Sequence, residues 1–161
     1  MSFQASNCET NKTLFTSANT FLKGLSMITR VLLPRILSAL VGLLMAVQTI
    51  GWITNPGETA QGLGMALLEG MGRSTQIGDF SSFFFSVTLF CFLGAYLKQA
   101  QWLISGAIIL GSAALFRSLA WIAHGADFAT DFIVAEVVMT ILLIVSAYLF
   151  NKSKDEVIES S

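Results

Sequence analysis

The sequence predicts an all-α membrane protein, a four-transmembrane-helix antiparallel bundle with a short interfacial helix between spans 1 and 2. Composition is the first reason, because 54% of the 161 residues are hydrophobic, only 12% are charged and the mean hydropathy is +0.71. A soluble domain of this length carries more charge. The second reason is that four stretches come close to the roughly 20 apolar residues that a helix needs to cross a bilayer. They are residues 36–54, 80–97, 102–123 and 132–150.

Each span is expected to be helical, because backbone amides in hydrocarbon must find their partners within the same segment. Before the first span, residues 1–20 are rich in Ser, Thr and Asn. Apolar residues then recur at helical spacing, which predicts a short helix on the membrane surface: Phe21, Leu22, Leu25 and Ile28. We therefore expect a polar cytoplasmic tail with a short amphipathic helix over 1–29, a four-helix transmembrane domain over 30–151 and a cytoplasmic tail over 152–161.

The distribution of basic residues predicts the orientation, since segments rich in Lys and Arg stay in the cytoplasm. Seven of the nine basic residues fall on the side that holds both ends of the chain: Lys12, Lys23, Arg30, Arg35, Lys98, Lys152 and Lys154. The opposite side has only Arg73 among five acidic residues. Both termini are therefore expected to be cytoplasmic. No Lys/Arg patch interleaved with aromatic residues is present, so nucleic acid is not an expected partner.

The first connection on the opposite side, residues 55–79, is longer than a turn. Its start, Asn55-Pro56-Gly57-Glu58, has a capping residue, a proline at the first helical position and an acid three residues after the cap. A short helix over residues 58–72 should follow, and it is too short to span and too apolar to stand in water. We expect it to lie on the outer surface of the bundle, either as a lid or as a simple interfacial connector.

Polar and small residues form a stripe on each of three spans, at about 100° per residue. The stripes contain Asp79, Ser82 and Ser86 on the second span, then Gly106, Ala113, Arg117, Ala120 and His124 on the third, and Glu136, Thr140, Leu143 and Ala147 on the fourth. Small residues mark the faces where membrane helices approach one another. The side chain of Arg117 is therefore expected to point into the bundle rather than toward lipid.

Depth along the helices brings Arg117 and Glu136 to the same level, roughly 6–9 Å below the outer surface at 1.5 Å per residue. An isolated charge within the membrane costs about 2.5–3.5 kcal/mol, so such residues are usually paired. We predict an ion pair between Arg117 and Glu136, with Asp79 as a second acceptor. His124 and Asp127 are expected in the connection above the pair, and together these five residues form the candidate polar cluster.

Three interpretations of this cluster are open. The ion pair can simply fix the packing register of the last two helices, or it can organise a ligand pocket open to the outer face. A membrane enzyme with Glu136 and His124 as acid and base is the third, although no nucleophile or cofactor motif accompanies them. A metal at His124, Asp127 and Asp131 is only weakly indicated, and a single histidine offers little for haem. No metal and no cofactor are expected.

Two stretches, IGDFSSFFFSVTLFCFLGAY and ALFRSLAWIAHGADFATDFIVAE, resemble a small bacterial four-helix integral membrane family, domain of unknown function 4345. The resemblance covers residues 36–150, and the matching positions are Asp79, Gly94, Arg117, Gly125 and Glu136. The polar amino-terminal tail is outside the pattern. The resemblance implies a four-helix bundle in a bacterial inner membrane and no particular activity.

The sequence thus predicts a small integral membrane protein, more consistent with a non-enzymatic accessory or ligand-binding subunit than with an enzyme. Its expected partners are the lipid bilayer and either a partner membrane protein or an apolar small ligand. The alternatives are a small proton-coupled carrier, in which Glu136 exchanges a proton, and a membrane enzyme acting on a lipid-like substrate.

Overall fold

A computed structural model describes residues 31–159, and this part of the chain consists of four long helices and one short one, without strands. The first span is Val31–Thr54, followed by α2 (Pro56–Gly62), α3 (Gly70–Leu97), α4 (Ala100–His124) and α5 (Thr130–Glu159). The predicted fold class is confirmed, including the short helix between the first two spans. The amphipathic helix predicted within residues 1–29 lies outside the described residues.

All four long helices are long and apolar enough to cross a membrane. Even the shortest, the 24-residue first span, is about 36 Å long at 1.5 Å per residue, which exceeds a hydrocarbon core of roughly 30 Å. Large apolar side chains cover its outward face: Ile36, Leu40, Leu43, Leu44, Val47, Ile50 and Ile53. Such a surface is stable against lipid and not against water. The chain is therefore a multi-pass membrane protein.

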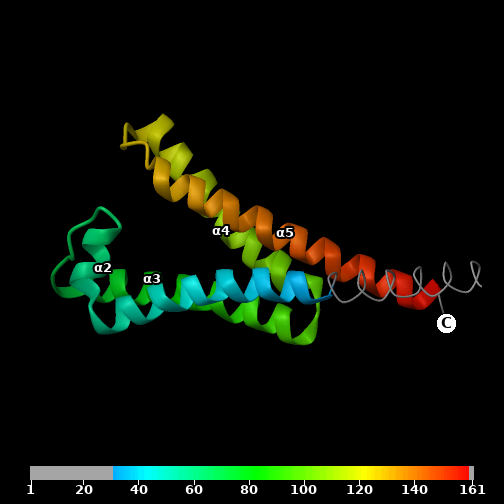
Figure 1. The fold of residues 1–161 in the computed structure, drawn as a ribbon. Helices are drawn as coiled ribbons and strands as arrows, with labels where there is room; N and C mark the ends of the chain where they lie inside the picture. The colour runs from blue at the N-terminus through cyan, green and yellow to red at the C-terminus, as the bar shows by residue number, and fades with distance from the viewer. Residues whose placement is uncertain (1–30, 160–161) are drawn as a thin grey trace, which may run out of the picture.

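The long helices form two pairs, which we call the first pair (the first span and α3) and the second pair (α4 and α5). Figure 1 shows that the two pairs lie together at the end that contains the α3–α4 turn and diverge toward the other end. We call these the closed end and the open end. Helix α2 and the loop between α4 and α5 lie at the open end, on different pairs. The bundle is thus antiparallel but splayed.

Within the first pair, a small residue allows close packing, and aromatic stacking adds to it. A Cβ atom at Gly42 would lie 3.0 Å from the Cβ of Cys91, so the first span and α3 approach closely there. The rings of Trp52 and Phe80 stack with centroids 4.7 Å apart. Near the closed end, Nε of Arg35 donates a hydrogen bond to the carbonyl oxygen of Ala95 at 3.0 Å. These contacts tie the first span to α3 along its length.

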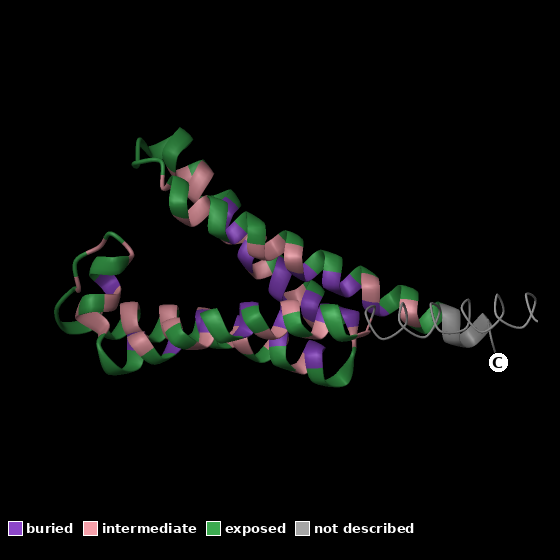
Figure 2. Ribbon diagram, viewed as in Figure 1, coloured by how far each residue is buried: buried purple, intermediate pink, exposed green. Residues whose placement is uncertain are grey.

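Helix α4 packs against both α3 and α5 and so joins the two pairs. Gly106 lies at the crossing, where a Cβ atom would come 3.3 Å from Cδ1 of Leu143 and 3.9 Å from Cγ1 of Val87. Leu103, Leu110 and Leu143 are almost fully buried around it. Figure 2 shows that the buried residues follow the seams between helices, while most of the open end is exposed. Gly106, one of the small residues in the stripe predicted on α4, therefore does face neighbouring helices.

Helix boundaries differ from the sequence prediction at three places. The helix predicted over residues 58–72 ends at Gly62, because Gly64 adopts a left-handed conformation with φ of 76° and the chain turns back. Helix α3 starts at Gly70, ten residues before the predicted span. Helix α5 continues through the predicted tail to Glu159. Hydropathy marks where a helix meets lipid, and both long helices continue beyond that zone into polar sequence.

The start of α3 is stabilised by polar side chains that hydropathy does not register. Arg73 makes an ion pair with Glu69 at 2.6 Å, and its Nε donates to the carbonyl oxygen of Leu68 at 3.1 Å. The side chain of Gln76 accepts a hydrogen bond from the Leu68 amide at 2.8 Å and donates one to the carbonyl oxygen of Ala66 at 3.1 Å. The loop after α2 is thereby folded back onto the first turns of α3.

Helix α2 begins at Pro56, as predicted, although the Asn55 side chain makes no capping hydrogen bond. The helix is anchored through Ala60, which is fully buried, and through apolar side chains of the loop that follows it. These side chains pack on the core: Leu63, Met65 and Leu67. The segment therefore lies against the open end of the bundle, as expected for a lid or an interfacial connector.

Candidate functional site

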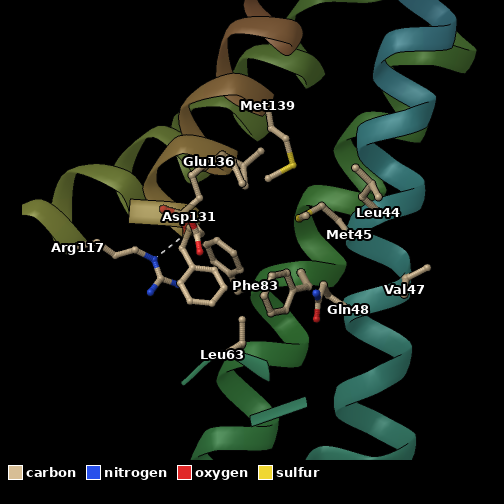
Figure 3. A pocket seen from close by; sticks show the side chains of 14 residues that line it. Leu44, Met45, Val47, Gln48, Leu63, Phe83, Arg117, Asp131, Glu136 and Met139 are labelled. Carbon is tan, nitrogen blue, oxygen red and sulfur yellow. Dashed lines mark hydrogen bonds and ion pairs between the residues drawn. The ribbon is translucent and has the colours of Figure 1, made fainter. Parts of the chain in front are cut away.

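Arg117 of α4 and Glu136 of α5 form the predicted ion pair. Nε of Arg117 lies 2.9 Å from Oε1 of Glu136 and donates a hydrogen bond to it. The Arg117 side chain is 30% exposed and that of Glu136 is 10% exposed, so both are directed into the molecule rather than outward. The guanidinium carbon also lies 5.1 Å from the centroid of the Phe132 ring, at a distance typical of a cation–π contact. Figure 3 shows the pair.

The hydrogen bonding of this pair is incomplete. Oε2 of Glu136 is buried and has no hydrogen-bond partner among the described residues. Arg117 has five N–H donors, and in the same part of the chain only its Nε is used in a hydrogen bond. A buried polar atom without a partner costs roughly 1–3 kcal/mol, so a further hydrogen bond to Oε2 of Glu136 would be stabilising.

A cavity of about 440 Å³ lies beside the ion pair, between the two helix pairs. Residues from all four spans and from the loop after α2 form its wall: Leu44, Met45, Val47, Gln48, Leu63, Phe83, Phe84, Leu110, Arg117, Asp131, Phe132, Ala135, Glu136 and Met139. Most of these side chains are apolar. The exceptions are Gln48 on the first span, Arg117 on α4, and Asp131 and Glu136 on α5. The cavity can therefore accept an apolar molecule that carries a polar group.

Asp79 is not the second acceptor that the sequence predicted. Its side chain is exposed, it does not line the cavity, and Arg117 pairs only with Glu136 within the described residues. The reason is the splay of the bundle, because α3 and the second pair move apart toward the open end where Asp79 lies (Figure 1). The prediction used only the depth of each residue along its helix and the face on which it lies.

His124 and Asp127 also lie outside the cavity wall. His124 ends α4, Asp127 lies in the exposed loop that follows, and both side chains are exposed. Asp131, in the first turn of α5, is the acidic residue of this region that lines the cavity. Within residues 31–159, no three His, Cys, Asp or Glu side chains lie close enough to hold a metal ion. Of the five candidate residues, the structure brings together Arg117 and Glu136.

Sequence reasoning missed the residues that the first span contributes to the cavity. Gln48 carried a signal, since it is a glutamine inside an otherwise apolar span, and polar residues at that depth usually face the protein interior. Met45, Phe84 and Met139 carried none, because apolar residues that line a cavity and apolar residues that face lipid look alike in a single sequence.

Comparisons of the chain with protein-family models, with curated proteins and with solved structures found no match. The similarity to domain of unknown function 4345 therefore stays a prediction from the residues quoted above. The fold and the candidate site rest on the geometry of this chain.

Proposed function

We propose that this protein is a non-enzymatic membrane subunit that binds an apolar small molecule with a polar group in the cavity between its helix pairs. The observation that carries the proposal is that all four spans contribute to one cavity whose wall contains a partly unsatisfied ion pair. Its volume of about 440 Å³ is within the usual range of small-molecule sites, roughly 300–1,000 Å³. Apolar walls with a few converging polar groups are also usual for such sites.

The location that we propose is a bacterial inner membrane, with both termini in the cytoplasm. Basic residues of the described part support it, because Arg35 and Lys98 lie at the closed end, whereas the open end carries several acids. These acids are Glu58, Glu69, Asp79, Asp127 and Asp131, with Arg73 as the basic residue among them. The open end and its cavity would then face the periplasmic side. Membership of domain of unknown function 4345 is proposed on the residues already quoted and adds no activity.

Two alternatives differ in how far the geometry favours them. A proton-coupled carrier needs an ionisable group in contact with its substrate, and Glu136 in the cavity wall meets that need. An enzyme with Glu136 and His124 as acid and base needs both groups at one cavity. Because His124 is exposed and does not line the cavity, the arrangement gives that mechanism no support.

Photolabelling tests the proposed binding function. The purified protein in lipid nanodiscs is irradiated with an alkyl diazirine photoprobe, and the labelled residues are mapped by mass spectrometry. We expect labelling of Met45 and Met139, which lie on different helices but line the same cavity. Ala135→Trp, which adds a bulky ring at a residue of the cavity wall, should reduce this labelling strongly, while Ala123→Trp, at an exposed position outside the wall near the end of α4, should leave it unchanged.

Two results would contradict the proposal. Labelling confined to lipid-facing residues such as Ile36 and Ile53 would mean that alkyl chains do not enter the cavity. Equal labelling of Met45 and Met139 in wild type and in Ala135→Trp would mean that these residues react from outside the cavity.

A further inference from the structure

The polar part of the cavity offers a hydrogen-bond acceptor and hydrogen-bond donors side by side. Oε2 of Glu136 is the acceptor, on a residue that is 7% exposed and lines the cavity. The donors are the terminal nitrogens of the Arg117 guanidinium, whose Nε is already bound to Oε1 of the same carboxylate. Figure 3 shows both groups at the cavity wall, and the Phe132 ring lies 5.1 Å from the guanidinium carbon. A ligand group that both donates and accepts a hydrogen bond can therefore bind Glu136 and Arg117 at the same time.

The charged side chains of the cavity wall limit which polar group of a ligand can bind there. The ion pair is neutral as a unit, and Asp131 adds a negative charge to the same wall. A carboxylate or phosphate would approach two acidic side chains, so an anionic group meets repulsion in surroundings of low polarity. An ammonium group has hydrogen-bond donors only, so it would leave the free N–H groups of Arg117 without an acceptor. An uncharged hydroxyl serves both residues, because it can donate to Oε2 of Glu136 and accept from Arg117 through one oxygen atom.

The apolar part of the cavity can hold a hydrocarbon tail, and the tail can enter from the lipid-facing surface. Met45, Phe84, Leu110 and Met139 are apolar residues of the cavity wall. Two further wall residues on the first span, Leu44 and Val47, are 50% and 61% exposed on the surface that contacts lipid. Because Leu44 and Val47 belong both to the cavity wall and to this exposed surface, the cavity extends to the surface at these residues. A tail can therefore pass from the bilayer into the cavity sideways.

We propose that the ligand of this cavity is a membrane-soluble alcohol, a molecule with one uncharged hydroxyl group and an alkyl or isoprenoid tail. This inference rests on the proposed binding function. The hydroxyl donates its hydrogen bond to Oε2 of Glu136 and accepts one from Arg117, and the tail lies against Met45 and Met139.

A matched series of photoprobes tests the assignment. Four alkyl diazirines of equal length, ending in a hydroxyl, an ammonium, a carboxylate or a methyl group, are offered separately to the wild-type protein in nanodiscs. We expect the hydroxyl probe to label Met45 and Met139 at least about fivefold more than each of the others, the effect of one net hydrogen bond. The double variant Arg117→Leu with Glu136→Leu removes both hydrogen-bonding groups, and there the hydroxyl probe should label no more strongly than the methyl probe.

The outcomes separate the inference from the function on which it rests. Equal labelling by all four probes in the wild type, or stronger labelling by the ammonium or carboxylate probe, would overturn the hydroxyl assignment and leave a binding cavity. Labelling of these two methionines by none of the probes would overturn the binding function and the assignment with it. The wild-type series by itself tests the hydroxyl assignment. The double variant tests whether the preference for the hydroxyl probe comes from the ion pair.

Discussion

Nε of Arg117 and Oε1 of Glu136 are 2.9 Å apart, although the two residues come from different spanning helices and are separated by 19 positions in the chain. Each charge is tolerated within the membrane because the other is present. The contact also fixes the rotation of α4 against α5, since both side chains must point into the same seam. The pair thus links the packing of the second helix pair to the wall of the cavity.

Removal of one partner should destabilise the protein far more than removal of both. Glu136→Leu leaves the Arg117 guanidinium without its counter-charge, and we expect a loss of about 3–5 kcal/mol in unfolding free energy. Arg117→Leu combined with Glu136→Leu should restore stability to within about 1 kcal/mol of wild type. Unfolding by denaturing detergent, followed by circular dichroism, measures both. Asp79→Leu is the control, because Asp79 is exposed and does not contact the pair. Equal losses in the single and double variants would show that the two charges do not compensate each other.

Close packing between α3 and α4 depends on a glycine near the closed end. A Cβ atom at Gly94 would lie 2.7 Å from Cγ of Leu103, closer than real atoms come. Gly94→Ala should therefore cost about 1–3 kcal/mol through overpacking, measured by the same unfolding assay. Gly78→Ala is a matched control in the same helix, because a Cβ there meets nothing within 4 Å. It should be neutral or stabilise by up to about 1 kcal/mol. Equal effects of the two substitutions would contradict the packing that the structure shows.

Spans and the ion pair could be predicted from the sequence because each depends on local regularities. Helix length follows from apolar runs, and the facing of Arg117 and Glu136 follows from 3.6-residue periodicity on two antiparallel helices joined by a short loop. Asp79 could not be placed in this way. Its distance from Arg117 depends on the angle between the helix pairs, which is set by contacts between α3 and α4 such as those of Gly106 with Val87 and of Gly94 with Leu103. The cavity depends on the same angle, so it too could not be predicted.

The α3–α4 turn contains a residue with a strained backbone conformation, and replacement by glycine should relieve the strain. Lys98 has a φ of 54°, in the left-handed region that costs a residue with a Cβ atom roughly 1–2 kcal/mol relative to glycine. Lys98→Gly should therefore raise unfolding free energy by about 1 kcal/mol. Lys98→Ala removes the same charge and keeps the strain, so it should bring no gain. If both variants had the same stability, the backbone conformation of this turn would not be the source of the effect.

Chemical labelling of single cysteines tests the proposed orientation. In a Cys8→Ser background, Cys91 is fully buried and should not react with a membrane-impermeant maleimide. Ala126→Cys lies in the exposed loop at the open end and should be labelled in intact cells, because we place that end outside. Lys98→Cys, in the exposed turn at the closed end, should be labelled only after the membrane is permeabilised. The reverse pattern would place the cavity mouth on the cytoplasmic side, and the asymmetry in basic residues would then have misled the assignment.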